Sequence, residues 1–458
     1  MILLLLVGVL NLDSLLLQPD LKPAICGIYI VRLDNGRTVY TANADKLLIP
    51  ASNMKIITTA AALYYLGADF RYKTRLALRG PLRDGRLAGD IILIGGGDPK
   101  FGIEQCGQFL SALKARGVRE VAGNIVVIDD FFTRERLPFG WSWHYLDAYY
   151  APEISALSFN DNVVSVTMAA TKPGDLVEAE MVPDTKYARL VNRMMTRTGP
   201  DSIIIYRTPE ANIIYLDGAL GKGRQRTIKV ALKDPARYCG TYFMELMRAE
   251  HIRVGGGVLE GSDNFFINPD SAALVEVIDS TMSVPLGDII RETNTESVNL
   301  YAEIMLKTLG ARQYGRGSYA AGLAATKEFL NRCGVDTALV SLSDGSGLSK
   351  YTLISAADIV RVLRWCRSQP FFPDLWGSMA QPGKGTMVNR MGGFTDSLRV
   401  KTGALDAVSC LSGYLVVGDV PCCFSLIFNN FTCSFKKING IQEGIVIKLA
   451  DYLRNGGN

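Results

Sequence analysis

The chain has 458 residues, of which 48% are hydrophobic and 21% are charged, so it can bury large cores and is long enough for two or three domains. The net charge of +4 is mild, and the basic residues are dispersed among acidic ones, which argues against a nucleic-acid partner. Two histidines, His144 and His251, leave little for a Ser-His-Asp triad or a histidine metal site, and we expect neither metal nor cofactor.

The nine cysteines include no Cys-x-x-Cys pair and lie mostly in apolar runs. This pattern favours small core residues over a disulfide framework or a zinc site. It leaves one or two disulfides open.

Residues 1–24 start with an apolar run from Met1 to Leu10. Asp13 interrupts this run before the roughly 20 residues that a membrane span needs. The basic segment and the cleavage site of a signal peptide are both lacking. We interpret residues 1–24 as a leader or a first helix, and expect no transmembrane span, with peripheral membrane association left open.

Residues 25–41 alternate in polarity and turn at Asp34-Asn35-Gly36, which predicts a β-hairpin. An apolar run then follows Pro50-Ala51-Ser52 and stops at Gly67, with Pro before and Gly after it, as helices prefer. Because this run is apolar nearly all round, we expect a buried helix with Ser52 at its start.

Residues 71–261 contain short β-branched runs separated by Gly, Pro, Asp and Asn, together with one clear helix near residues 235–250. They predict a β-rich insert of one or two domains. Helical patterns return after Pro285, and strand patterns after residue 396 precede a last helix near residues 437–454.

These patterns predict an α+β fold. Residues 25–70 and 262–458 are expected to form one antiparallel sheet covered by helices, and residues 71–261 to interrupt it.

Three short motifs carry the chemistry: Ser52-Asn-Met-Lys55, Ser297-Val-Asn299 and Lys401-Thr402-Gly403. Each is weak alone, since Ser111-x-x-Lys114 and Ser434-x-x-Lys437 copy the first, and Ser158-x-Asn160 and Ser262-x-Asn264 copy the second. Ser52 differs because proline precedes it and a buried helix follows, with Lys55 on the same helical face. An ordinary helix cap at Ser52 is the alternative.

A serine hydroxyl needs a base to become a nucleophile, and a lysine can be that base if burial lowers its pKa by several units. The apolar helix would bury Lys55, and the helix start offers the backbone N–H of Ser52 to an oxyanion. We therefore predict Ser52 as nucleophile and Lys55 as its base.

Ser297 is expected to relay a proton, and Asn299 to hold a substrate amide and orient Lys55. A simple helix cap at Thr295 or Ser297 is the alternative. At a strand end, Gly403 would leave room for an added substrate strand, Lys401 would contribute positive potential, and Thr402 would bind a carboxylate. An exposed strand-to-turn transition is the alternative there.

The ordered motifs make the chain resemble penicillin-binding proteins of the D-alanyl-D-alanine carboxypeptidase and endopeptidase type, of low molecular mass and with a long insert after the first motif. The segments that carry the likeness, besides the motifs, are PASNMKIITTAAALYYLG, GGGDP at 95–99, APEISALSFNDN at 151–162, SDGSGLS at 343–349 and GTMVNRM at 385–391. The resemblance covers nearly the whole chain.

The resemblance implies a β-lactamase/transpeptidase-like domain of sheet and helices, acting outside the cytoplasm on peptidoglycan stem peptides and inhibited by β-lactams. It implies that Ser52 is acylated, that Lys55, Ser297 and Asn299 handle protons, and that Lys401 and Thr402 bind the substrate carboxylate. It indicates no oligomeric state.

One departure concerns Ala404, where the family usually has Ser or Thr to bind the carboxylate. Its backbone N–H can still form an oxyanion hole with that of Ser52. Two alternatives share the fold: a β-lactamase, although the class A Glu-x-x-Leu-Asn segment is lacking, and a non-catalytic cell-wall binding protein.

Overall fold

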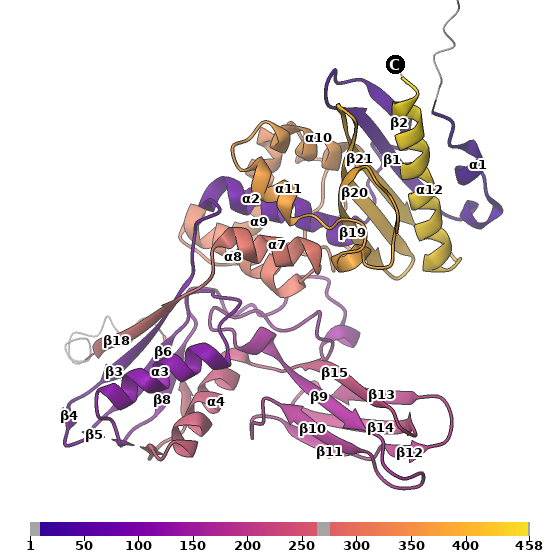
Figure 1. Ribbon diagram of the computed structural model, residues 1–458. Coiled ribbons are helices and arrows are strands. Elements are labelled where there is room, and N and C mark those ends of the chain that lie inside the picture. The colour runs from indigo at the N-terminus through magenta and orange to yellow at the C-terminus, as the bar shows by residue number, and fades with distance from the viewer. Residues whose placement is uncertain (1–9, 263–274, 457–458) are drawn as a thin grey trace, which may run out of the picture.

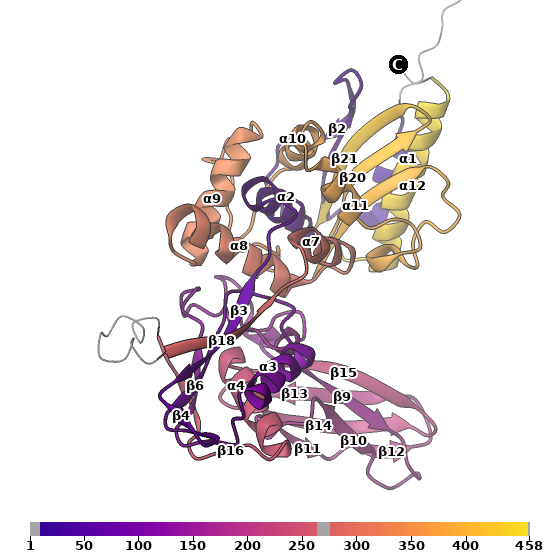
Figure 2. The same ribbon diagram turned by 60° about the vertical axis from the view of Figure 1, so that its left-hand side comes forward.

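The structure is a computed structural model that describes residues 10–262 and 275–456. It has two parts (Figure 1). One holds a sheet built from both ends of the chain and the helices packed on it, and the other holds the insert. The chain crosses between the parts twice, from α2 (Met54–Leu66) into β3 (Lys73–Arg79) and from β18 (Val275–Met282) back into α7 (Leu286–Thr295). Strands β3 and β18 lie side by side (Figure 2).

The sheet of the first part joins residues that are far apart in the sequence. Its five strands are all antiparallel, in the order β19-β20-β21-β1-β2. Their bounds are β1 Ile25–Arg32, β2 Thr38–Ala42, β19 Ser397–Leu405, β20 Val408–Val417 and β21 Val420–Asn429. The predicted hairpin is confirmed, since β1 and β2 pair with Ile28 opposite Ala42.

One face of this sheet is covered by the last helix, α12 (Phe435–Arg454), which buries Ile438, Ile441 and Ile445 against the strands. A short segment with α1 (Asp13–Leu16) and the 3-10 helix η1 (Pro19–Leu21) lies next to α12. Leu12 in that segment is fully buried. Residues 10–24 thus pack on the body of the protein, and residues 1–9 lie outside the described part.

The other face is covered by a helical layer. Its members are α2 Met54–Leu66, α7 Leu286–Thr295, α8 Asn299–Tyr314, α9 Tyr319–Arg332, α10 Ala356–Arg367 and α11 Phe372–Ser378. Helix α2 is the central one, with every residue from Met54 to Leu63 buried. It follows the 3-10 turn η2 (Ala51–Asn53) and ends at Gly67, whose φ is +81°. The buried helix expected after Ser52 is therefore confirmed.

In the residues that the structure describes, the insert contains four further sheets, of three to five strands each, and two α-helices. Its strands are β3 Lys73–Arg79, β4 Leu82–Arg83, β5 Arg86–Leu87, β6 Asp90–Ile94, β7 Glu120–Val121, β8 Ile125–Ile128, β9 Val163–Ala169, β10 Glu178–Val182, β11 Arg189–Asn192, β12 Met195–Arg197, β13 Ser202–Arg207, β14 Ile213–Gly221, β15 Gln225–Ala231, β16 Arg253–Val254, β17 Val258–Glu260 and β18 Val275–Met282. The sequence predicts this β-rich character correctly.

The helices of the insert differ from the expectation of one clear helix. The expected one is α4 (Pro235–Ala249), and a second, α3, spans Ile103–Ala115. Its buried residues Cys106, Phe109, Leu110 and Leu113 form a single stripe, while most of the remaining surface is polar and Ile103 is exposed. That narrow stripe, interrupted by Gly107, is a weak signal among neighbouring strands.

Strand β18 bears on where the insert ends. It follows residue 261, the expected boundary, yet it pairs along its length with β3 of the insert, with Met282 opposite Lys73. We therefore propose that the insert extends to about residue 282.

In the described ranges 10–262 and 275–456, no helix combines the length and apolarity needed to cross a bilayer. All nine cysteines lie in these ranges, and each has a free thiol.

Candidate active site

Ser52 lies in a tight turn held between two glycines. Ala51, just before it, has a φ of +45°, which is unusual for a residue with a Cβ. A Cβ on Gly347 would lie 1.8 Å from the Ala51 carbonyl oxygen, and one on Gly403 would lie 2.9 Å from that of Pro50. Both neighbours must therefore be glycine for the turn to be packed as it is. Strain of this kind is typical of functional sites.

Lys55, one turn into the helix, is fully buried beside Ser52. Its Nζ lies 2.9 Å from Ser52 Oγ, 2.5 Å from Asn299 Oδ1 and 2.9 Å from the Ser346 carbonyl oxygen. A neutral amine has two N–H donors and one lone pair, so it can donate to the two carbonyl-type oxygens and accept the Ser52 proton. The three contacts suit a lysine that acts as a base.

Electrostatics favour that neutral form. Burial lowers the pKa of Lys55 from 10.5 to about 7, and the nearby carboxyl groups of Asp344 and Glu303 oppose this fall. Near neutral pH a substantial fraction of Lys55 is therefore unprotonated.

The carboxyl groups also hold the loop that faces the lysine. Glu303 on α8 accepts hydrogen bonds from the backbone N–H groups of Gly345 and, at 2.7 Å, Ser346. Asp344 accepts from the N–H of Gly347 at 3.1 Å. Burial, together with the charge of Asp344, raises the pKa of Glu303 to about 8. The loop whose Ser346 carbonyl accepts from Lys55 is thus held in place by these two carboxyl groups.

Asn299 is the first residue of α8, and its amide connects two segments. Its Oδ1 accepts from Lys55, while its Nδ2 donates to the Tyr150 carbonyl oxygen at 2.7 Å. The helix start is not capped by a serine or threonine, because Val298 occupies the cap position and makes no side-chain bond there.

Ser297 and Lys401 form a second serine-lysine pair. Lys401 is fully buried, and its Nζ lies 3.0 Å from Ser297 Oγ and 2.9 Å from the Thr402 carbonyl oxygen. Burial and then the charge of Lys55 lower the pKa of Lys401 well below its ordinary value. Ser297 has a φ of +63°, the second strained residue of the site.

Strand β19 presents its outer edge to the site. Val400 exchanges both of its backbone hydrogen bonds with Ala380 across that edge. Because amide directions alternate along a strand, the N–H groups of Thr402 and Ala404 point to the same edge. Beyond Val400 this edge faces the cleft, which Thr402 and Ala404 help to line.

These segments enclose a cleft of about 740 Å³ at the junction of the helical layer, the sheet and the insert. Of the eight predicted site residues, five line it: Ser52, Ser297, Asn299, Thr402 and Ala404. Lys55, Lys401 and Gly403 are buried behind its wall. The structure thus brings all three motifs together at one place.

Sequence reasoning assigned no role to several residues of the site. Tyr145, Tyr149 and Tyr150 line the cleft from the insert, and Glu303 and Asp344 support it from behind. The aromatic stretch WSWHYLDAYY at 141–150 was a usable signal for the tyrosines. The two carboxyl groups had no signal of their own, because acidic residues in a helix or loop are usually exposed.

The copies of the motifs lie elsewhere. Ser111 is exposed on α3 and bonds the Gly107 carbonyl, and Ser434 caps α12. Ser158 is buried and donates to the Ser155 carbonyl. For the copy that starts at Ser262, the partner Asn264 lies outside the described residues.

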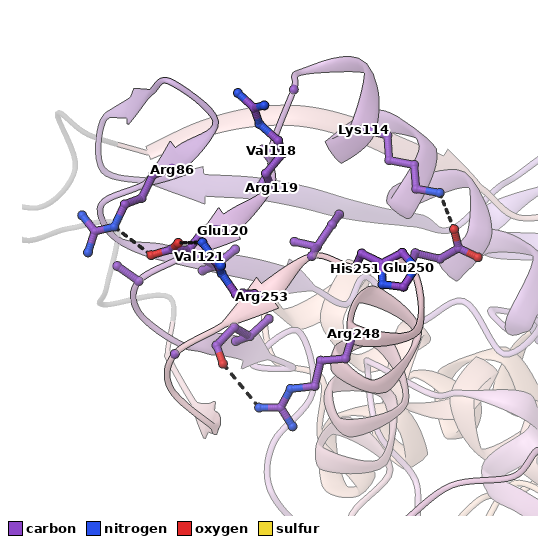
Figure 3. A pocket seen from close by; sticks show the side chains of 15 residues that line it. Arg86, Lys114, Val118, Arg119, Glu120, Val121, Arg248, Glu250, His251 and Arg253 are labelled. Carbon is purple, nitrogen blue, oxygen red and sulfur yellow. Dashed lines mark hydrogen bonds and ion pairs between the residues drawn. The ribbon is translucent and has the colours of Figure 1, made fainter.

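A larger hollow of about 1390 Å³ lies at the far tip of the insert (Figure 3). Its charges are mostly paired: Glu120 lies between Arg86 and Arg253, and Lys114 binds Glu250 at 2.6 Å. None of the fifteen described residues that line it is a serine. Of these two cavities, the smaller cleft is the one lined by the motif residues Ser52 and Ser297. Nowhere in residues 10–262 and 275–456 do three or more His, Cys, Asp or Glu side chains gather as metal ligands.

Comparisons with known proteins agree with this geometry. The chain is 32% identical to a D-alanyl-D-alanine carboxypeptidase of Actinomadura sp. (strain R39), over 96% of this chain and 84% of that one. It is 22% identical to the D-alanyl-D-alanine carboxypeptidase DacB of Haemophilus influenzae, over 85% and 82%.

The crystal structure of penicillin binding protein 4 (dacB) from H. influenzae superposes with a TM-score of 0.83 at 20% identity, covering 96% of this chain and 99% of that one. A second structure of that protein holds a β-lactam and superposes with a TM-score of 0.78. These matches confirm the predicted fold of a transpeptidase-like domain with an insert.

The model of the D-Ala-D-Ala carboxypeptidase 3 (S13) family matches residues 9–451, nearly the whole chain. The family resemblance and the enzyme class predicted from the sequence are thereby confirmed. The chain belongs to the D-Ala-D-Ala carboxypeptidase 3 (S13) family of serine peptidases.

Proposed function

We propose that Ser52 is the acylated nucleophile of a D-alanyl-D-alanine carboxypeptidase and endopeptidase that acts on peptidoglycan stem peptides. One observation carries the proposal: the buried Lys55 Nζ, with its pKa near 7, lies 2.9 Å from Ser52 Oγ. A serine paired with an unprotonated lysine is an activated nucleophile for acyl transfer.

In the acylation step, Lys55 takes the proton of Ser52 while Oγ attacks the carbonyl carbon of the penultimate D-alanine. The oxyanion that forms lies between the backbone N–H of Ser52, at the start of the helical segment, and that of Ala404, on the edge of β19. Asn299 holds Lys55 in place through its Oδ1. Because Asn299 also lines the cleft, it can bind an amide group of the substrate.

Collapse of the tetrahedral intermediate breaks the C–N bond, and the leaving amine takes up a proton. Ser297 is placed to relay it, since its hydroxyl lies in the cleft and is bonded to Lys401. Water then attacks the ester and gives a proton to Lys55, which passes it to Ser52 Oγ as the ester C–O bond breaks, and the shortened peptide is released as its carboxylate.

The edge of β19 is the natural binding place for the substrate backbone, which can add as a further strand beside Thr402 and Ala404. The Thr402 hydroxyl and the positive potential of Lys401 then select the terminal carboxylate. Ala404 adds no hydroxyl of its own. Carboxylate selectivity is therefore expected to be weaker than with Ser or Thr at this position.

A β-lactam should acylate the same serine, because it is a strained amide shaped like the substrate. We expect an intact-protein mass increase equal to one inhibitor, mapped to the peptide that contains Ser52, and no increase for Ser52→Ala. Labelling of Ser52→Ala to the level of wild type would contradict the proposal.

The same experiment separates the two alternatives. A β-lactamase would release the adduct rapidly and turn over a chromogenic β-lactam, whereas a long-lived adduct supports the peptidase. A non-catalytic binding protein would cleave no D-Ala-D-Ala peptide. Cleavage by wild type together with its loss in Lys55→Ala would exclude that alternative.

The substrate also implies where the enzyme works. Peptidoglycan lies outside the cytoplasmic membrane, so we propose an extracytoplasmic location. Fractionation of the producing cells with an antibody against the chain would test it, and recovery of the protein with the cytosol would contradict it.

A further inference from the structure

A group of exposed aromatic side chains borders the cleft and takes no part in the reaction proposed above. Among residues 10–262 and 275–456, the four most exposed aromatic side chains are Trp143 (69%), Phe139 (67%), Tyr149 (60%) and Tyr351 (57%). We call them the aromatic ridge. Phe139 and Tyr351 contact each other, and exposed aromatic surface beside a cleft often marks a binding site.

The ridge is continuous with the cleft. Tyr149 itself lines the cleft that contains Ser52, and Tyr145, next but one to Trp143, lines it as well. On the other side, the Phe139 ring lies 4.9 Å from the Tyr351 ring, and Tyr351 follows closely on Leu348, which also lines the cleft. Whatever occupies the cleft therefore has this surface directly beside it.

The ridge is also held in place. The indole N–H of Trp141 donates to Asp344 at 3.1 Å, and Asn299 donates to the Tyr150 carbonyl at 2.7 Å. Trp143 stacks on His144 with ring centroids 3.8 Å apart. The segment that carries Phe139, Trp143 and Tyr149 is thus anchored to the active site on either side of Trp143, which limits the backbone entropy lost when a ligand binds there.

We infer that the aromatic ridge binds the glycan strand to which the stem peptide is attached, so that the enzyme recognises sugar and peptide together. This inference rests on the proposed function. The faces of pyranose rings expose C–H groups that pack on aromatic rings, while their hydroxyl groups stay in water at the edges. A stem of three or four residues spans at most roughly 10–14 Å, so the sugar attached to a peptide in the cleft would lie within that distance of it.

Charge argues against a membrane as the occupant. Residues 139–151 contain Asp147 and neither lysine nor arginine, whereas surfaces that bind anionic lipids carry clusters of basic residues. Serine, histidine and aspartate alternate with the aromatic residues here, which suits a polar ligand with apolar faces.

The test compares two substrates: a stem peptide that ends in D-Ala-D-Ala, and the same peptide attached to a tetrasaccharide of the glycan strand. For Trp143→Ala and Phe139→Ala, we expect kcat/KM on the sugar-bearing substrate to fall roughly three- to tenfold, the usual effect of one lost ring contact. On the free peptide, kcat/KM should stay unchanged. Tyr314→Ala is the control, because Tyr314 is an exposed aromatic residue at the far end of α8 from Asn299.

Two results would overturn the inference: equal losses on both substrates, which would assign the ridge to the peptide site, or no loss on either. Co-sedimentation of wild type with phosphatidylglycerol vesicles that is lost in Trp143→Ala would assign the ridge to a membrane and overturn it as well. Acylation of Ser52 by a β-lactam is measured in every variant. If wild type is not acylated, the proposed function fails, whereas normal acylation with unchanged substrate preference removes only this inference.

Discussion

The titration of Lys55 offers a direct test of the proposed base. With a pKa of about 7, the neutral fraction is about one tenth at pH 6, one half at pH 7 and nine tenths at pH 8. The second-order rate of acylation by a β-lactam should follow this fraction. We expect a rise of about fivefold from pH 6 to pH 7, less than twofold from pH 7 to pH 8, and a plateau above, measured by mass spectrometry of quenched samples.

The same titration must affect stability, because the pKa of Lys55 is lower in the folded protein than its ordinary value of 10.5. Between these two values the unfolded chain binds a proton that the folded protein does not, so stability rises with pH in this window. Below pH 7 the folded protein carries the full penalty of a buried charge. At about 1.4 kcal/mol per pH unit, the gain from pH 6 to pH 9 amounts to about 3 kcal/mol.

Lys55→Met isolates this contribution, since methionine fills a similar volume and does not titrate. The free energy of unfolding is measured by urea denaturation of both proteins at pH 6, 7, 8 and 9. The difference between wild type and variant should change by about 3 kcal/mol in favour of the lysine as pH rises. Parallel pH profiles for the two proteins, or an acylation midpoint near pH 10, would refute the assignment of Lys55 as a base of lowered pKa.

Three substitutions test the rest of the site. Gly403→Ala places a Cβ 2.9 Å from the Pro50 carbonyl oxygen and should displace the Ser52 turn, lowering the acylation rate on the order of 100-fold while the melting temperature changes little. An unchanged acylation rate would show that the Ser52 turn can accommodate the added Cβ, and would contradict this prediction. Ala404→Ser adds a hydroxyl at an exposed position of the cleft, and should lower KM for a peptide with a free terminal carboxylate roughly three- to tenfold but not for its amide. Equal effects on both peptides would exclude a carboxylate contact. Glu303→Ala removes the acceptor of two buried backbone N–H groups and should reduce kcat and stability together. Glu303→Gln keeps a carbonyl oxygen as acceptor and should restore most of both. If Glu303→Gln does not restore them, the charge of Glu303 itself has a role.

Much of the fold follows from local signals in the sequence. Asp34-Asn35-Gly36 fixes the first hairpin, and Pro50 with Gly67 delimits a helix whose apolar composition requires burial. Helix α3 was missed because only one narrow stripe of its surface is apolar. The pairing of β18 with β3 depends on residues about 200 positions apart, which no local pattern records.

The site, like the fold, could be predicted in part from the sequence. The three motifs identify the residues that meet in the cleft, but not how each one is placed. Lys401 is the clearest case: the motif predicts that it contributes positive potential and binds the substrate carboxylate with Thr402, but not that its amine lies behind the wall, bonded to Ser297. Its role as a source of positive potential stays a prediction. Burial of a lysine depends on tertiary packing, and the sequence around Lys401 reads as an ordinary strand.

The carboxyl groups behind the site explain why Lys55 can be a useful base. Burial alone would lower the pKa of the amine further, and a base of lower pKa would remove the Ser52 proton less readily. The charge of Asp344 opposes the burial, while Glu303, with a pKa of about 8 and mostly protonated at neutral pH, contributes less. The pKa of Lys55 therefore stays at about 7, where the lysine can accept a proton and give it up again. Neither residue belongs to a motif, yet both also fix the loop whose Ser346 carbonyl orients the amine. We therefore expect the reactivity of Ser52 to depend on these buried acids, contributed by α8 and by the loop before α10, as well as on the lysine beside it.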